Sequence, residues 1–327
     1  MKQDRVIALG FFDGVHRGHG ALLQRAAQRA KEMGAESAVF TFDRPPKEVV
    51  TGKKVYLINS TDDRRDLMER LYGIDRVIFA PFDDNMMHCS WQDFLTELLI
   101  RENGAVHLVA GHDHHFGHKN QGSPELLMQK CAELGLGCDI IPKVELEGIT
   151  VSSTYIRRLV ELGQVERAAQ FLGHPHVLTQ VVRHGRRIGH TIGIPTVNLT
   201  APPKVLVPSH GGYATRVFLP DGSSYMGVTN VGTRPTVDNG NDITVETWLL
   251  DFDGDLAAIP RNKYTKWFDY DKMAVFPDFR TRQAGDYMKL SSGAGKPELM
   301  TRKVARVMLD AGVPSRFRDR ILFPCRG

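Results

Sequence analysis

The sequence lacks long apolar runs. No window comes near the ~18 consecutive apolar residues that a membrane-spanning helix needs. The apolar run at residues 6–9 is too brief for the core of a signal peptide and indicates a buried strand instead. Internal repeats and low-complexity segments are lacking as well, which excludes repeat architectures. We therefore expect a cytoplasmic protein with no membrane partner.

Cysteine is scarce. The four cysteines form no CxxC pair and show no spacing typical of a disulfide framework. A reduced, cytoplasmic environment is the simplest interpretation. Four histidines gather at His112, His114, His115 and His118, but no cluster of Cys or carboxylates completes a ligand set, so we predict no metal site there.

Net charge is also small, at +4 over 327 residues, but it is unevenly distributed. Residues 257–327 hold 15 Lys and Arg against 7 Asp and Glu, whereas the remainder holds 27 against 31. The hydrophobic fraction of 42% and charged fraction of 24% are ordinary for a globular chain of two or three domains. The basic last quarter suggests a polyanion partner, although surplus surface charge is the commoner cause.

Short apolar runs alternate with amphipathic helical stretches up to about Pro142. We expect strands at residues 6–9, 38–42, 76–79, 106–110 and 138–141, and helices at residues 20–33, 62–72, 91–101 and 125–134. This rhythm predicts an α/β domain of Rossmann-like type, with a parallel sheet covered by helices on both faces. Ligands of such sheets bind beyond the carboxyl ends of the strands, which directs attention to the loops after Leu9, Phe42 and Ala110.

The pattern changes after Leu172, where glycine and proline become frequent. Alternating segments at residues 177–182, 212–218, 224–229 and 244–251 are separated by turn sequences such as Pro-Asp-Gly and Asn-Gly. These features predict a small antiparallel β-barrel.

A glycine-rich turn follows the first expected strand. Residues 10–19 read GFFDGVHRGH, so His16 and His19 are three residues apart where the next helix should begin. That spacing places both imidazoles on one face, near a helix N-terminus that favours phosphate. Two histidines in this position can donate hydrogen bonds to phosphoryl oxygens.

Four motifs in order resemble the nucleotidyltransferase module of the bacterial bifunctional riboflavin kinase/FAD synthetase family. They are FDGVHRGH at residues 12–19, TFDRPP at 41–46, GHDHHFG at 111–117 and SSTYIR at 152–157. The second departs from the family's TFxPHP, because Pro45 stands where the family usually has His. The resemblance implies catalytic roles for His16, His19 and Arg157, and nucleotide or flavin contacts for Gly10, Phe12, Asp13, Gly14, Gly111, Asp113, Phe116, Ser152, Ser153 and Thr154.

The last motif also has a mechanical interpretation. A Ser or Thr before a helix caps its N-terminus, and Arg157 in the first turn can reach triphosphate oxygens. The implied reaction is attack of the FMN phosphate on the α-phosphorus of ATP with release of pyrophosphate. Because a phosphate monoester is already anionic, catalysis reduces to in-line positioning and charge neutralisation. Mg²⁺ is expected to arrive largely with the nucleotide.

A second site is expected in the barrel. Residues 195–198 read PTVN and resemble the riboflavin kinase PTAN motif, and residues 211–214 and 230–236 resemble that family's GVYA and NIGxRPT segments. The resemblance implies that Thr196 and Asn198 hold Mg²⁺-ATP and that Glu246 is the catalytic base. A base is needed because the 5′-hydroxyl of riboflavin is a poor nucleophile until its proton is accepted.

The likeness to riboflavin kinase stops at Leu256. Residues 259–271, 280–287 and 313–321 are instead similar to the C-terminal domain of tRNA(Ile)-lysidine synthetase, which helps to hold tRNA. Weak RNA binding through residues 257–327 is therefore expected. Nothing in this segment resembles that enzyme's ATP-pyrophosphatase centre, so lysidine synthesis is not predicted.

The sequence thus predicts three parts: a FAD synthetase domain at residues 1–172, a truncated, incomplete kinase barrel at 173–256, and a small α+β appendage at 257–327. The leading hypothesis is FAD synthesis from FMN and ATP, with riboflavin kinase activity impaired or lost. One alternative is a fully bifunctional enzyme in which residues 263–276 supply the missing strand. Another is a non-enzymatic nucleotide- or RNA-binding fusion, or a recombined chain that folds poorly.

Overall fold

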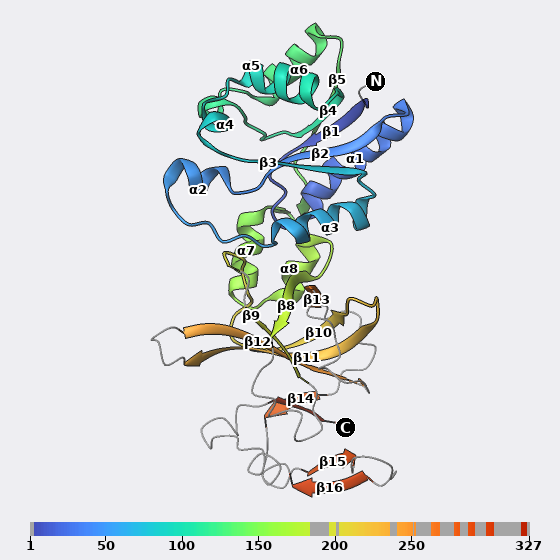
Figure 1. Ribbon diagram of the computed structural model, residues 1–327, viewed down its shortest axis with the longest axis vertical. Helices are drawn as coiled ribbons and strands as arrows, with labels where there is room; N and C mark the ends of the chain where they lie inside the picture. Colours follow the sequence, from blue (N-terminus) through green and yellow to red (C-terminus); the bar gives the residue numbers. More distant parts are fainter. Residues whose placement is uncertain are drawn as a thin grey trace. The chain divides into compact units, whose positions relative to one another are not determined.

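The computed structural model describes residues 3–183, 196–200, 203–235, 241–250, 252, 263–268, 278–281, 287–291, 299–303 and 322–325 (Figure 1). The chain forms two compact units. The first comprises Met1–His176 with Pro203–Leu206, and the second comprises Val177–Pro202 with Val207–Gly327.

The first unit is built on a five-stranded parallel sheet with the order β3-β2-β1-β4-β5. Its strands are β1 (Arg5–Leu9), β2 (Glu36–Phe42), β3 (Arg76–Ala80), β4 (Ala105–Gly111) and β5 (Gly137–Ile141). The predicted Rossmann-like sheet is confirmed. Because all five strands are parallel, their carboxyl ends share one edge, and the loops after β1, β2 and β4 meet there.

Helices cover both faces of this sheet (Figure 1). One face carries α1 (Arg17–Met33) and α3 (Thr61–Tyr72), and the other carries the π-helix η1 (Phe94–Glu102) and α6 (Pro124–Glu133). Shorter helices are α2 (Pro46–Thr51), α4 (Asp84–His88), α5 (Trp91–Asp93) and the 3₁₀ turn η2 (His118–Asn120), and a small hairpin pairs β6 (Glu145–Leu146) with β7 (Ile149–Thr150). The unit ends with α7 (Ser153–Glu161) and α8 (Val165–Leu172).

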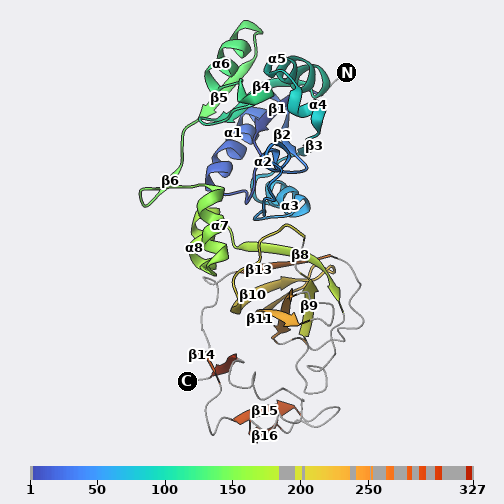
Figure 2. The ribbon, with the colours of Figure 1, turned by 90° about the vertical axis from the view of Figure 1, so that its left-hand side faces the viewer.

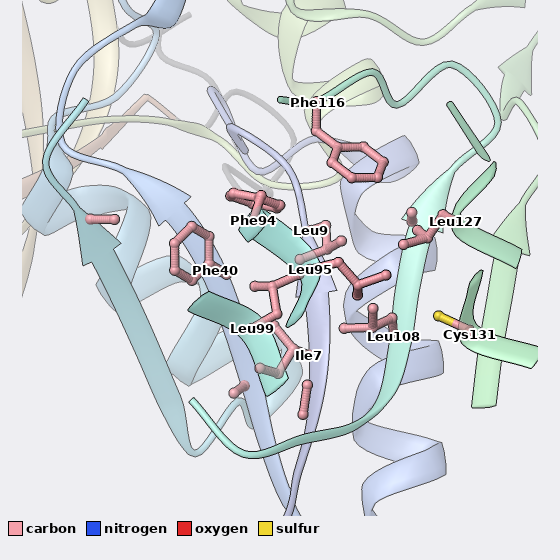
Figure 3. Close-up of a cluster of buried hydrophobic side chains, with 14 residues drawn as sticks. Ile7, Leu9, Phe40, Phe94, Leu95, Leu99, Leu108, Phe116, Leu127 and Cys131 are labelled. Atoms are coloured by element: carbon pink, nitrogen blue, oxygen red, sulfur yellow. The ribbon is translucent and has the colours of Figure 1, made fainter. Parts of the chain in front are cut away.

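The core between the sheet and η1 is drawn in Figure 3. Ile7 and Leu9 of β1 alternate along one face and pack with Leu95 and Leu99 of η1, four residues apart on one side of that helix. All four side chains are at most 1% exposed. The alternating residues of β1 and the residues four apart in η1 thus form a single apolar layer, which fixes the carboxyl end of β1.

A short segment from later in the chain also belongs to the first unit. Residues Pro203–Leu206 lie beside residues 55–58, where the Leu57 N–H donates to the Lys204 carbonyl at 2.8 Å and the Leu206 N–H donates to the Leu57 carbonyl at 2.8 Å. This pairing fixes the backbone that leads into Ile58.

The second unit contains a closed antiparallel barrel with the order β10-β11-β12-β9-β8-β13. Its strands are β8 (His176–Arg183), β9 (Thr196–Thr200), β10 (Gly211–Phe218), β11 (Ser224–Pro235), β12 (Asn241–Leu249) and β13 (Lys263–Phe268). Three buried threonines from neighbouring strands, Thr215, Thr229 and Thr247, are joined by hydroxyl–hydroxyl contacts of 2.8 and 2.6 Å. They satisfy one another's polar groups inside the barrel.

The expectation of an incomplete barrel is wrong. Strand β13 pairs with β10, with Arg216 opposite Trp267 and Phe218 opposite Thr265, and Figure 2 shows β13 beside β8 and β10. The physical reason is that a ladder joins backbone groups and needs no particular side-chain motif. The sequence KYTKWF is rich in residues that favour strands, so it can close the barrel although it does not resemble the family's ending.

The rest of the C-terminal segment contributes two small sheets among its described residues. Strand β14 (Asp278–Thr281) pairs with β17 (Leu322–Cys325), and β15 (Tyr287–Ser291) pairs with β16 (Leu299–Lys303). The predicted likeness to a tRNA-holding domain falls mostly outside the described residues and stays a prediction.

No helix within the described parts of the chain has the length and apolar character to cross a membrane.

Replacing Lys266 with Pro should destabilise the barrel, because proline removes a backbone donor and its ring disfavours the ladder opposite Val217. We expect a loss of at least about 1 kcal/mol, the usual net contribution of a hydrogen bond, and a lower melting temperature. Thermal unfolding followed by circular dichroism measures this, with Lys266→Ala as the matched control. Equal melting temperatures for the two variants would show that β13 does not close the barrel.

Candidate active site

A cavity of about 1160 Å³ opens at the carboxyl ends of the parallel strands. Its walls include Gly10 and Phe11 after β1, Phe42 and Pro45 after β2, the β4 loop from residue 114 to 120, and Arg157 of α7. The cavity therefore lies where the fold predicts ligand binding, and it gathers three of the four motifs identified in the sequence.

The turn between β1 and α1 has an unusual backbone. Phe12, Gly14 and Val15 have φ values of 57°, 86° and 41°. Glycine adopts such values freely, but a β-branched residue does so only under strain. Gly14 is also required by packing, because a Cβ there would lie 2.8 Å from Ile58 Cδ1. The turn is therefore held in place by its surroundings rather than by its own preferences.

Asp13 is the centre of the contacts that hold the turn. Its carboxylate is 2% exposed, accepts the Ile58 N–H at 2.8 Å, and accepts Nη2 and Nε of Arg157 at 2.8 and 3.1 Å. Burial raises the pKa of Asp13, while the Arg157 charge and the hydrogen bonds act to lower it. A buried carboxylate with these charge-assisted partners is a rigid anchor.

The start of α7 packs on the same turn. Ser152 is the N-cap and accepts the Tyr155 N–H at 3.3 Å, as predicted for this motif. Ser153 instead donates its hydroxyl to the Asp13 carbonyl at 2.9 Å, and Thr154 is exposed. Arg157, in the second turn of the helix, lines the cavity while bound to Asp13. The structure thus brings together residues about 140 positions apart in the sequence.

The two histidines of the turn stack face to face. Their ring centroids are 3.6 Å apart with an interplanar angle of 11°, so they share one face as predicted. His16 is the N-cap of α1, and its Nδ1 accepts the His19 N–H at 3.2 Å. The proton of neutral His16 is therefore on Nε2. Burial lowers the pKa of His16 to about 4 and that of His19 well below its usual value. Both rings are neutral hydrogen-bonding groups near pH 7.

Arg64 of α3 is a residue of this site that the sequence motifs did not reveal. Its side chain is fully buried, donates from Nη1 to the Phe11 carbonyl at 2.7 Å and from Nη2 to the Phe42 carbonyl at 3.1 Å, and lies 4.5 Å from the Phe11 ring centroid. Burial lowers its pKa to about 10. Arg64 ties the ends of β1 and β2 together. Its spacing from Leu67 and Met68, three and four residues on, marks the buried face of α3 and could have revealed it.

The loop after β4 contributes one exposed side chain, Asp113, and one buried side chain, Phe116. Asp113 has a side chain 83% exposed, whereas Phe116 is 6% exposed and belongs to both the core and the cavity wall. Gly111 accepts the His114 N–H at 3.1 Å, which closes a tight turn. Within the described residues, no group of three or more His, Cys, Asp or Glu side chains is placed to hold a metal ion.

The loop after β2 keeps its shape without the family's histidine. Pro45 is the N-cap of α2 at φ −62° and Pro46 is its first residue. Asp43 accepts the Phe82 N–H at 3.1 Å, which fixes the base of the loop. The departure at Pro45 therefore leaves a proline-bound turn that lines the cavity.

In the barrel, the structure brings two predicted kinase residues together. Asn198 of β9 lies opposite Glu246 of β12, and Glu246 lies opposite Asn230 of β11. Directly opposed residues share one face of a sheet, and Asn198 and Glu246 are half-buried there. Thr196 lies two residues before Asn198, opposite Trp248. Residues 184–195, which precede this motif, lie outside the described residues.

Comparisons with known proteins agree with this arrangement. Residues 1–155 match the family model described as FAD synthetase, and residues 172–263 match the one described as riboflavin kinase. A bifunctional riboflavin kinase/FMN adenylyltransferase of Listeria monocytogenes is 33% identical over 269 residues, covering 82% of this chain and 84% of the relative. The protein of the same name from Pseudomonas fluorescens is 35% identical over 257 residues, covering 77% and 80%.

A solved structure titled as a macrolide-efflux protein from Streptococcus pneumoniae has a TM-score of 0.70 and 27% identity, and the match covers 84% of this chain and 90% of that one. The likeness supports a similar fold for this chain.

The parallel sheet and the closed barrel, with the matches to two family models, define a two-module flavin enzyme. The chain belongs to the family of bifunctional riboflavin kinase/FMN adenylyltransferases. The family predicted from the motifs is confirmed, and the riboflavin kinase match extends past Leu256 to the first residue of β13.

The buried histidines predict an acid-sensitive fold. The pKa of His16 and of His114 is about 4 in the folded chain, below the ordinary value of 6.5. The unfolded chain therefore binds more protons between pH 6.5 and 4, so stability is lost as the pH falls through this window. Each of these two residues should contribute roughly 1 kcal/mol per pH unit near pH 5. Asp13, whose pKa is raised, acts in the opposite direction.

Urea unfolding at pH 7, 6 and 5 measures this slope. His114→Gln should reduce it by about 1 kcal/mol per pH unit. His112→Gln is the matched control for replacing a histidine in the same loop, since the His112 side chain is 47% exposed. An identical slope in wild type and His114→Gln would remove His114 from the acid response.

Proposed function

We propose that the chain is fully bifunctional: the barrel phosphorylates riboflavin to FMN, and the first unit transfers an adenylyl group from Mg-ATP to FMN, giving FAD and pyrophosphate. The observation that carries the adenylyl-transfer assignment is the assembly of the β1 turn and the start of α7 around Asp13, beside the cavity that Phe11 and Arg157 line. Family membership supports both reactions.

In the first unit, an oxygen of the FMN phosphate attacks the α-phosphorus of ATP, and the bond to the bridging oxygen of pyrophosphate breaks. No side chain has to accept a proton, so the protein's task is to position and to neutralise charge. His16 and His19 are neutral donors at the N-terminus of α1, which itself favours phosphate. Arg157 is oriented by Asp13 through Nε and Nη2, and we assign Nη1 to the triphosphate.

The cavity suits a flavin and its phosphate. Phe42 and Phe82 meet edge to face at 4.9 Å between centroids, and with Tyr56 and Met86 they form an apolar wall for the isoalloxazine ring. Lys47, Lys53 and Lys54 also line the cavity and add positive charge for the FMN phosphate. The contacts predicted for Gly10, Gly111, Asp113 and Phe116 are part of this proposal.

In the barrel, Glu246 accepts the proton of the riboflavin 5′-hydroxyl as that oxygen attacks the γ-phosphorus of ATP, and ADP leaves. Asn198, directly across the ladder, and Thr196 are assigned to Mg-ATP. The sequence favoured an impaired kinase because its likeness to the family stops at Leu256, before the segment that covers the flavin. The family match to residue 263 and the closed barrel favour the bifunctional alternative instead.

Two further expectations stay proposals. Weak, salt-sensitive RNA binding through residues 257–327 rests on the charge surplus of that segment, although β13 shows that part of it serves the barrel. A cytoplasmic location rests on the sequence, with its scattered cysteines and lack of long apolar runs.

Two variants test the assignment reciprocally. His19→Ala should lower the kcat for FAD formation from FMN by tenfold or more, the typical loss for a transition-state donor, and leave riboflavin phosphorylation unchanged. Glu246→Gln should abolish riboflavin phosphorylation and leave FAD formation from FMN unchanged, because only the barrel uses a base.

Each variant serves as the control for the other, and Asp221→Asn, in the exposed β10–β11 turn, controls for loss of a carboxylate in the barrel unit. Separate assays with riboflavin plus ATP and with FMN plus ATP are read by chromatography of the flavins. A folded wild-type protein that forms no FAD would overturn the assignment of the first unit. One that forms FAD but no FMN would overturn full bifunctionality.

A further inference from the structure

His174 lies outside all the motifs and outside the cavity, yet it contacts the strained turn. Helix α8 ends at Gly173, whose φ of 84° turns the chain so that His174 points back into the first unit. The imidazole is 5% exposed, its Nε2 lies 3.0 Å from the Gly14 carbonyl oxygen, and its Nδ1 lies 2.8 Å from the Pro175 carbonyl oxygen. Both ring nitrogens face carbonyl oxygens, and a neutral imidazole donates to only one of them. The tautomer with the proton on Nε2 donates a hydrogen bond to Gly14.

The direction of the Gly14 carbonyl group is coupled to the strained φ of Val15. The peptide that joins Gly14 to Val15 is planar, so its direction is set by ψ of Gly14 and φ of Val15 together. Rotating this plane by roughly half a turn would move φ of Val15 from 41° into the extended region that any L residue adopts. Gly14 would tolerate the change because it has no Cβ. Backbone preference therefore favours a flipped peptide, and the observed one has to be held.

Two hydrogen bonds oppose that flip. His174 Nε2 binds the Gly14 carbonyl, and the Val15 N–H on the same peptide donates to the Phe12 carbonyl at 3.1 Å. A flip would break both. It would also disturb the residues on either side of the peptide: Asp13, which orients Arg157, and His16, which caps α1 and stacks on His19.

We infer that His174, in the tautomer that carries its proton on Nε2, is a positioning residue for adenylyl transfer: its hydrogen bond to the Gly14 carbonyl holds the turn in the strained conformation in which Asp13 orients Arg157 and His16 caps α1. The inference rests on the proposed function for its catalytic consequence. His174 touches no substrate in this account and acts through the turn.

The test compares His174→Gln with His174→Leu in the full chain. The two side chains are similar in size, but only Gln keeps an N–H donor within reach of the Gly14 carbonyl. We expect His174→Leu to lower the kcat for FAD formation about 10- to 100-fold with KM values changed less, since misplacement by about an ångström has costs of that order. His174→Gln should stay within about threefold of wild type, because the bond is kept.

A second comparison, made in a Val15→Gly background, tests whether His174 acts by holding the strained backbone of Val15. Glycine at position 15 adopts a φ of 41° without penalty, so in a Val15→Gly background the further change His174→Leu should cost less than about threefold in kcat. Riboflavin phosphorylation by the same samples, together with circular dichroism, reports whether each variant is folded. The inference is overturned if His174→Leu lowers the kcat for FAD formation equally in the wild-type and Val15→Gly backgrounds. It is also overturned if His174→Gln and His174→Leu lower that kcat equally, because His174 would then act only by packing.

Hydrogen–deuterium exchange gives a readout that does not depend on activity. The Val15 amide should exchange faster in His174→Leu than in wild type and at the wild-type rate in His174→Gln, because its bond to Phe12 depends on the held peptide. If wild type forms no FAD, the proposed function fails and the exchange comparison still decides on His174. Unchanged exchange in His174→Leu would contradict the inference directly.

Discussion

The adenylyl-transfer site depends on one buried carboxylate. Asp13 joins the β1 turn to the backbone at Ile58 and to the guanidinium of Arg157, so residues 45 and 144 positions away meet on one side chain. Taking a carboxylate out of water is costly unless it is paired and hydrogen-bonded. Asp13 has both kinds of partner, and the arrangement forms only when β1, the segment after α2 and α7 are all in place. The site is therefore a product of the tertiary fold.

Backbone strain is concentrated around that anchor. Val15 and Phe12 have left-handed φ values, and the contacts that resist relaxation come from Ser153, Arg64 and His174. These residues lie on three different elements that converge behind the turn. Strained turns persist at functional sites when their surroundings over-determine them. Here polar side chains from three parts of the chain hold the turn that leads from the cavity-lining residues Gly10 and Phe11.

Much of this could be predicted from the sequence, because periodicity and turn residues are local signals. The parallel sheet, the cap at Ser152 and the shared face of His16 and His19 follow from spacing alone. The closure of the barrel by β13 could not, since ladder pairing uses backbone groups that every residue has. The backbone partners of Arg64 and His174 could not either, although helical spacing marks Arg64 as part of the buried face of α3. Each binds backbone carbonyls distant in sequence, and no motif encodes the position of a carbonyl.

The measurement that tests this account most directly is the rate of FAD formation by Asp13→Asn in the full chain. Asparagine has nearly the same shape and can still accept the Ile58 N–H, but it carries no charge to orient Arg157. We expect the kcat for adenylyl transfer to fall about 100-fold because the site is out of position, and riboflavin phosphorylation to stay within about twofold of wild type. FAD formation at the wild-type rate in a folded Asp13→Asn protein would contradict it, because the turn and Arg157 would then be in place without their anchor.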